Sequence, residues 1–120
     1  MGDAYQKEGE IMDKSIDAIV DEFVEAIQGS SIYKEYVRQQ NIVKNQQDVI
    51  DKINEIRSLN MRLQSIHNSE QAYDEQDRLE KRFDELSEDK RVYDFVEAEN
   101  RFIGMYQEIY RRIMENIQFI

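Results

Sequence analysis

The chain has no cysteine, no proline and no tryptophan, and it has only 4 glycines among 120 residues. Without cysteine there is no disulfide, no thiolate nucleophile and no cysteine-ligated metal or cluster. With so little proline and glycine, the chain lacks the turn residues that separate the strands of a β-rich fold. It also lacks a run of roughly 18 apolar residues, which a membrane span needs. These absences favour an all-helical protein. Together with the lack of a signal peptide, they predict a cytoplasmic location.

Positive charge is scarce as well. The sequence holds 16 lysines and arginines against 26 aspartates and glutamates, which gives a formal net charge of −10. Contacts with nucleic-acid phosphates, or with an anionic membrane surface, need a basic face that no segment supplies. We therefore expect an acidic protein with no direct nucleic-acid partner and no membrane partner.

The length fits one small domain, and no linker rich in glycine or serine divides it. We expect a polar, frayed N-terminus over residues 1–10 and a single helical domain over residues 11–120. Apolar residues recur every three or four positions through nearly all of that domain, which is the spacing of amphipathic helices. The expected segments are about 11–27, 32–43, 49–66, 70–86 and 92–117. The predicted fold is an elongated antiparallel bundle of about four to five helices with a long C-terminal helix.

Polar signals separate these segments. Gly29 is placed to end the first helix in a left-handed conformation, and Ser30 and Ser31 can cap the next one. Asn45 resembles a helix cap with an acidic partner three residues on, so we expect a break there. Asp89 closes the polar stretch that should cap the last helix.

The last helix carries two apolar stripes. The first is a heptad seam interrupted by one charge, and its members are Val92, Val96, Glu99, Ile103, Tyr106, Tyr110, Ile113 and Ile117. The second lies beside it and comprises Phe95, Ala98, Phe102, Met105 and Ile109. A helix that is apolar over so wide an arc must be covered on two sides, and a second subunit can supply part of the cover. We therefore predict a homodimer whose interface is formed by Glu99, Ile103, Tyr106, Tyr110, Ile113 and Ile117.

Glu99 falls within the apolar seam, where a carboxylate needs a charged or hydrogen-bonding partner. Two interpretations remain open. Glu99 pairs with a base or a tyrosine of another helix and fixes the register, or the helix turns it outward to solvent.

The sequence offers few candidates for catalysis. Two groups of acidic residues at helical spacing could hold Mg²⁺, as in all-helical nucleotide pyrophosphohydrolases. The first group is Glu22 and Glu25, and the second is Asp77, Glu80 and Asp84. The same spacing is typical of a solvated helix face, and there is no nucleophile elbow or phosphate-binding loop. We predict no catalytic, cofactor-binding or metal-ligating residue and no cofactor. The hydrolase and a plain structural homo-oligomer are the alternatives.

The stretch from Ala26 to Tyr36 resembles the signature of the YlbF/YmcA family of small bacterial regulators. That pattern is Ala-Ile, two residues, Ser, two residues, Tyr, two residues, Tyr. The last helix agrees at Val92, Tyr93, Ala98, Glu99, Ile103, Tyr106 and Ile109, although Lys90 stands where family members often have proline. The matched motif positions are Ala26, Ile27, Ser30, Tyr33, Tyr36, Ala98 and Glu99.

The resemblance covers about residues 16–117 and implies an all-helical, elongated, dimeric cytoplasmic protein without catalytic residues. Family members regulate competence, sporulation and biofilm formation as subunits of a complex that influences RNA processing. That complex is associated with iron–sulfur clusters, which a chain without cysteine cannot ligate by thiolates. We expect a non-enzymatic regulatory or scaffold protein that acts by helix-mediated association. Its expected partners are itself and other proteins, with related family members and RNA-processing proteins as candidates.

Overall fold

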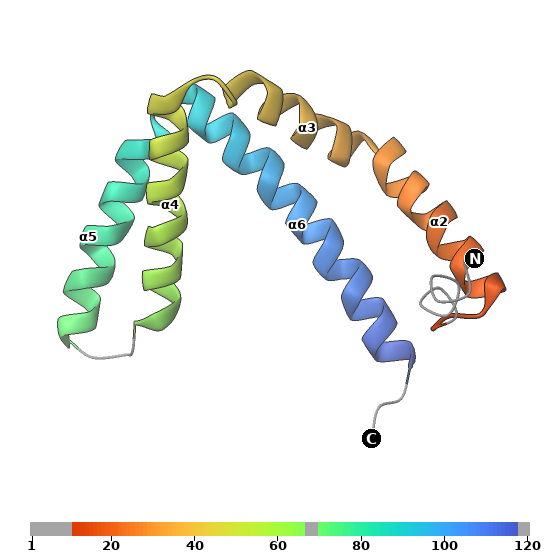
Figure 1. Cartoon of the computed structure of the whole chain (residues 1–120). Coiled ribbons are helices and arrows are strands. Elements are labelled where there is room, and N and C mark those ends of the chain that lie inside the picture. Colours follow the sequence, from red (N-terminus) through yellow and green to blue (C-terminus); the bar gives the residue numbers. More distant parts are fainter. Residues whose placement is uncertain (1–10, 67–69, 118–120) are drawn as a thin grey trace. The chain divides into compact units, whose positions relative to one another are not determined.

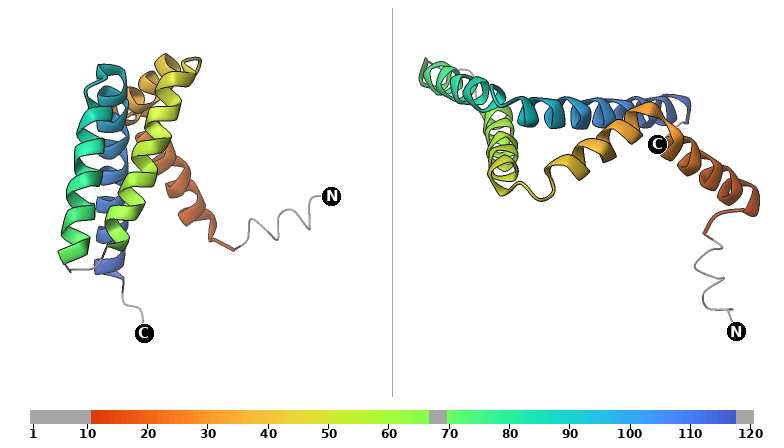
Figure 2. Two further views of the ribbon diagram at one scale, coloured as in Figure 1. Left: turned by 90° about the vertical axis from the view of Figure 1, so that its left-hand side faces the viewer. Right: turned by 90° about the horizontal axis from the view of Figure 1, so that it is seen from above.

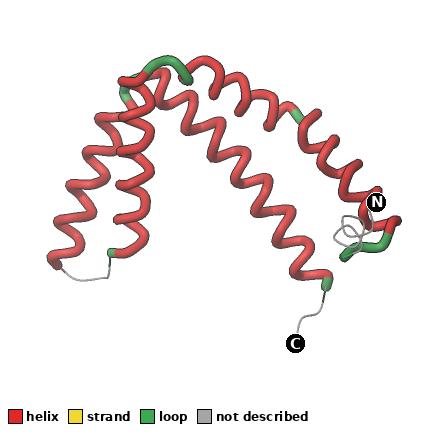
Figure 3. Tube along the Cα trace, viewed as in Figure 1, coloured by secondary structure: helices red, strands yellow, loops and turns green. Residues whose placement is uncertain are grey.

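The computed structural model describes residues 11–66 and 70–117, with the side chains of residues 70 and 71 left aside. It contains five helices in these ranges: α2 (Lys14–Gly29), α3 (Ser31–Val43), α4 (Gln47–Ser65), α5 (Glu70–Ser87) and α6 (Lys90–Asn116) (Figure 1). No strand occurs in the described part of the chain (Figure 3). The predicted all-α fold with a long last helix is therefore confirmed. The polar N-terminus expected over residues 1–10 lies outside the described residues.

The chain forms two compact units, the first ending at Lys34 and the second beginning at Glu35. The first contains α2 and the start of α3, and the second contains the rest of α3 with α4, α5 and α6. The prediction of one continuous domain over residues 11–120 stays a prediction.

In the second unit, α4 and α5 form an antiparallel hairpin, and both contact α6 (Figures 1 and 2). Two ion pairs bridge the hairpin along its length, Arg82 with Glu55 and Arg62 with Glu75. Moving seven residues along α4 moves the partner seven residues back along α5, as expected for antiparallel neighbours. These pairs are exposed, so they set the register of the hairpin more than they stabilise it.

The core of the second unit lies where the hairpin meets the first half of α6. Its buried members are Val43, Val49, Ile53, Ile56, Leu59, Leu79, Leu86, Val92 and Phe95. On α4 these residues follow steps of three and four, which makes one apolar stripe facing α5 and α6. Each such side chain contributes about 1.5–3 kcal/mol when fully buried, so this stripe holds α4 in place.

Two local expectations are wrong. Gly29 is the last residue of α2 and does not adopt a positive φ. The carbonyl of Ile27 is satisfied instead by the N–H and hydroxyl of Ser30, at 3.1 and 2.7 Å, so no left-handed residue is needed. The break before α4 is where it was expected, but the residue at its cap position is Gln46 rather than Asn45.

Candidate interaction surface

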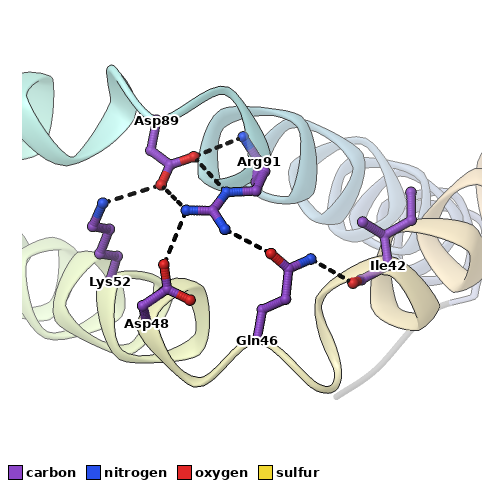
Figure 4. A network of polar contacts seen from close by, with 6 residues as sticks. All are labelled: Ile42, Gln46, Asp48, Lys52, Asp89 and Arg91. Carbon is purple, nitrogen blue, oxygen red and sulfur yellow. Dashed lines mark hydrogen bonds and ion pairs between the residues drawn. The ribbon is translucent and has the colours of Figure 1, made fainter.

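A polar network fixes the beginning of α6 against α4 (Figure 4). Asp89 caps α6 as predicted, because its carboxylate accepts a hydrogen bond of 3.0 Å from the backbone N–H of Arg91. The same carboxylate accepts from the Arg91 guanidinium at 2.7 Å and from Lys52 Nζ at 3.0 Å. These bonds, with Arg91 foremost, hold the pKa of the Asp89 carboxyl well below its usual range. Asp89 therefore stays ionised and ties the start of α6 to α4.

The Arg91 guanidinium extends this network to the start of α4. It donates to Asp48 Oδ2 at 3.0 Å and to Gln46 Oε1 at 2.6 Å. The amide nitrogen of Gln46 donates in turn to the carbonyl of Ile42 at 2.8 Å. Gln46 is therefore occupied on both sides, which explains why its side chain does not cap α4. The network spans the end of α3, the start of α4 and the start of α6.

Glu99 lies further along α6 and is paired with two other helices. Its Oε2 accepts a hydrogen bond of 2.7 Å from Arg57 of α4 and one of 3.2 Å from the Tyr36 hydroxyl of α3. The Glu99 side chain is only 15% exposed, whereas Arg57 is half exposed and lies over the Phe95 ring at 6.0 Å. Of the two interpretations of Glu99, the structure shows the first: it pairs with a base and a tyrosine. Burial and then the negative charge of Glu99 raise the pKa of the Tyr36 hydroxyl.

A series of aromatic rings runs from this cluster toward the C-terminal half of α6. Tyr36 stacks on Phe102 with ring centroids 5.1 Å apart, and Phe102 stacks on Tyr106 at 6.1 Å. Tyr36 also meets Phe95 at 6.0 Å in a tilted arrangement. Phe95 is buried, Tyr36 and Phe102 are half-buried, and Tyr106 is 61% exposed. The heptad seam therefore passes from core to surface between Glu99 and Tyr106.

Beyond Glu99 the seam is exposed. We call its exposed residues, together with the neighbouring Met114, the α6 stripe: Ile103, Tyr106, Tyr110, Ile113, Met114 and Ile117. They include all the predicted interface residues except Glu99. The charged residues of the same segment lie on the other side of the helix and pair with one another, Arg111 with Glu108 and Glu115, and Arg112 with Glu108. The hydrogen bonds from Arg111 and then Arg112 lower the pKa of Glu108 to about 2.

The first unit also presents an exposed apolar surface. We call it the α2 stripe: Ile16, Ile19, Val20, Phe23 and Val24. None of the residues Lys14–Gly29 of α2 is buried. The acids of this helix are Asp17, Asp21, Glu22 and Glu25, and the described residues contain no ion pair that involves any of them. The two stripes therefore differ in charge: the helix that carries the α2 stripe is acidic, and its carboxylates form no ion pair within the described residues.

The family-motif positions have structural roles on these helices. Ser30 caps α3, because its hydroxyl accepts a hydrogen bond of 3.1 Å from the backbone N–H of Tyr33. Ala98 is buried on α6 beside the paired Glu99. Ala26 is exposed and Ile27 is half-buried on the last turn of α2. Ser30 and Tyr36 thus define the start of α3 and its contact with α6.

The acidic pairs considered for Mg²⁺ do not converge. Glu22 and Glu25 lie exposed on α2, and Asp77, Glu80 and Asp84 lie exposed on α5. Within residues 11–66 and 70–117, no group of three or more potential metal-ligating side chains comes together.

Some participants were missing from the sequence-based prediction. Arg57 carries no local sign that it is the partner of Glu99, since the two are 42 positions apart. The link from Arg91 to Asp48 is equally remote. Met114 could have been found, because it lies one helical turn beyond Tyr110 on the exposed side.

The described residues form an all-α protein. Its last helix is buried at the start and exposed at the end. The described helices include none that combines the length and hydropathy needed to cross a membrane. The chain belongs to the YlbF/YmcA family: residues 16–118 match the family described as control of competence regulator ComK, YlbF/YmcA. The family is linked to the regulation of competence. No curated protein and no solved structure was found to match the chain.

Proposed function

We propose that this chain is a non-enzymatic, cytoplasmic regulatory subunit that acts by helix-mediated association, first with a second copy of itself. The observation that carries the proposal is the α6 stripe. Six large apolar side chains at heptad and neighbouring positions are exposed on the second half of α6 and its C-cap residue, whereas the first half of the helix supplies Val92 and Phe95 to the core. Such a continuous exposed row marks an interaction site more often than a solvated surface.

A second copy is the partner that best suits the α6 stripe. The charged residues behind it on the same helix, Glu108, Arg111, Arg112 and Glu115, are balanced, so this segment carries no excess of like charge that would repel a second copy. A two-fold axis would place each stripe against the same residues of the other copy. Tyr106 and Tyr110 suit such a boundary, because their rings bury apolar area while their hydroxyls reach solvent.

The family supports the regulatory part of the proposal, since it is linked to the control of a competence regulator. In this role the dimer would bind other proteins, with related family members and RNA-processing proteins as candidates. No observation on the described residues favours the Mg²⁺-dependent hydrolase. A titration that detected Mg²⁺ or Mn²⁺ binding weakened by removal of Glu22 and Glu25 would reopen that alternative.

The mass of the protein in solution tests the association. We expect light scattering to give twice the 14.4 kDa chain mass for the native protein and a value near 14.4 kDa for Tyr110→Glu. The added carboxylate would have to be desolvated in the interface, which costs more than the apolar contact provides. Circular dichroism should show unchanged helicity, because Tyr110 is 63% exposed in the single chain.

Gly104→Glu is the matched control. Gly104 lies on the same helix, away from the α6 stripe, and a Cβ at this position meets nothing within 4 Å. The control adds the same charge and should keep the native mass. A native chain that stays monomeric at all concentrations, with Tyr110→Glu indistinguishable from it, would refute self-association through α6. A plain structural oligomer would be indicated if Tyr110→Glu lost the dimer without changing competence in living cells.

A further inference from the structure

The α2 stripe needs a partner of its own. The helix has 16 residues and none of them is buried, although its apolar side chains form a single row at helical spacing. A helix of this length is only marginally stable in water unless its apolar face is covered. The α2 stripe is therefore the candidate docking surface of the first unit, and the charge around it indicates what it would accept.

That charge is strongly acidic. Four acids and one base, Lys14, lie on α2, and the described residues supply no counter-ion to those acids. At 100° per residue, Asp21 lies about 60° beyond Val24 on one side of the stripe, and Glu22 lies about 60° beyond Ile19 on the other side. Long basic side chains at the edges of a partner that covers the α2 stripe can reach both carboxylates.

A second copy of this chain is poorly suited to that position. Each copy carries a formal charge of −10, so its surface repels an acidic helix. Every arginine of the chain is already within ion-pair distance of a carboxylate. Outside α2, the lysines without an ion pair in the described residues are Lys34, Lys44 and Lys81, which are spread over α3, the turn after it and α5. Nucleic acid and anionic lipid are excluded by the same sign of charge.

We propose that α2 docks through its apolar stripe into an apolar groove of a different protein, and that lysines and arginines on the rim of this groove pair with Asp21 and Glu22. Apolar contact supplies the binding energy, and the unpaired carboxylates select the partner and accelerate encounter. The proposal uses a different helix from the self-association through α6, so either can fail alone.

The test begins with the full chain carrying a photo-cross-linking amino acid in place of Ile19, which is 62% exposed at the centre of the α2 stripe. After irradiation in the native cytoplasm, mass spectrometry identifies the cross-linked peptide. We expect a peptide from a different protein with apolar residues flanked by lysine or arginine. Cross-links confined to this chain, cross-links to lipid, or the absence of any adduct would each overturn the proposal.

The protein so identified is then purified and titrated with the native chain and with two double variants. Asp21→Lys with Glu22→Lys should weaken binding at least tenfold in low salt, and added salt should weaken native binding. Asp77→Lys with Glu80→Lys makes the same charge change at exposed positions of α5 and should leave the affinity within twofold. Equal losses in both variants, or an affinity that ignores salt, would contradict recognition by the acidic border.

Light scattering separates this proposal from the proposed function. The Asp21→Lys, Glu22→Lys variant should keep the native mass, and Tyr110→Glu should still cross-link to the partner from position 19. If Tyr110→Glu abolished both the dimer and the cross-link, α2 would act only as part of the self-assembled protein, and independent docking would be wrong.

Discussion

At the scale of single residues, a few polar groups decide how the helices of the second unit meet. Glu99 joins α3 and α4 to α6 through Tyr36 and Arg57. Asp89 joins α4 to α6 through Lys52 and Arg91. Both carboxylates lie on α6 or at its start, and both are less than one-fifth exposed. Apolar packing would allow α6 to slide by a turn, whereas these bonds are satisfied in one register only.

Glu99→Ala should lower the free energy of unfolding by about 1 kcal/mol, because Tyr36 and Arg57 lose a charged acceptor while Arg57 can still reach water. Urea unfolding measures the change. Combined with Arg57→Ala in a double-mutant cycle, it should show coupling of about 0.5–1 kcal/mol. Asn100→Ala, at the next and exposed position, should change stability by less than about 0.5 kcal/mol. Additive effects of Glu99→Ala and Arg57→Ala would mean that the pair contributes nothing.

Asp89 should make stability depend on pH on the acid side. Its pKa is lowered in the folded chain, so its contribution is complete above the ordinary carboxyl value of about 4 and is lost as the pH falls toward the folded value. Asp89→Asn should therefore be less stable than the native chain at pH 7, and the difference should shrink below about pH 4. Urea unfolding from pH 7 to pH 3 tests this, with the exposed Asp77→Asn as control. If the difference in stability between Asp89→Asn and the native chain did not change with pH, the charge of Asp89 would not contribute to stability.

At the scale of elements, the helices could be predicted more fully than their surroundings. The five segments follow from apolar periodicity, and the start of α6 follows from Asp89. Gly29 marks the end of α2 but not the way it ends, because Ser30 satisfies the free carbonyl of Ile27 without a left-handed residue. Nor does the sequence show which part of the α6 seam is buried and which part is exposed. Val92 and Tyr110 occupy the same pattern, yet Val92 is fully buried and Tyr110 is exposed.

Helix α4 allows a direct test of which apolar positions hold the second unit together. Ile56 is 2% exposed and packs in the core, whereas Met61 of the same helix is 72% exposed. Ile56→Ala should cost about 2–5 kcal/mol, because it removes buried area and leaves a cavity. Met61→Ala should change stability by less than about 0.5 kcal/mol in urea unfolding. Comparable losses at the two positions would mean that Met61 is covered in solution.

At the scale of the whole molecule, charge distinguishes the two exposed stripes. Eight acids and three bases precede Glu35, and the described acids of α2 lack ion pairs. The charged residues on the same segment of α6 as the α6 stripe are paired with one another. The sequence shows the acidic excess, but it does not show which charges are already paired, since pairs such as Arg82 with Glu55 join distant positions. Pairing decides which excess is available to a partner.

The continuity of α6 has a consequence for the lifetime of the protein. Its last turns, around Ile113 and Ile117, have few neighbours to hold them, so they unwind more often than the buried turns around Val92. No proline interrupts the helix, and the same hydrogen-bonded ladder connects both ends. Opening that begins at the exposed end therefore spreads toward the core unless a partner covers it. If the proposed association covers this end, a copy without a partner should offer proteases an unwound segment first, and its abundance should follow the supply of partner.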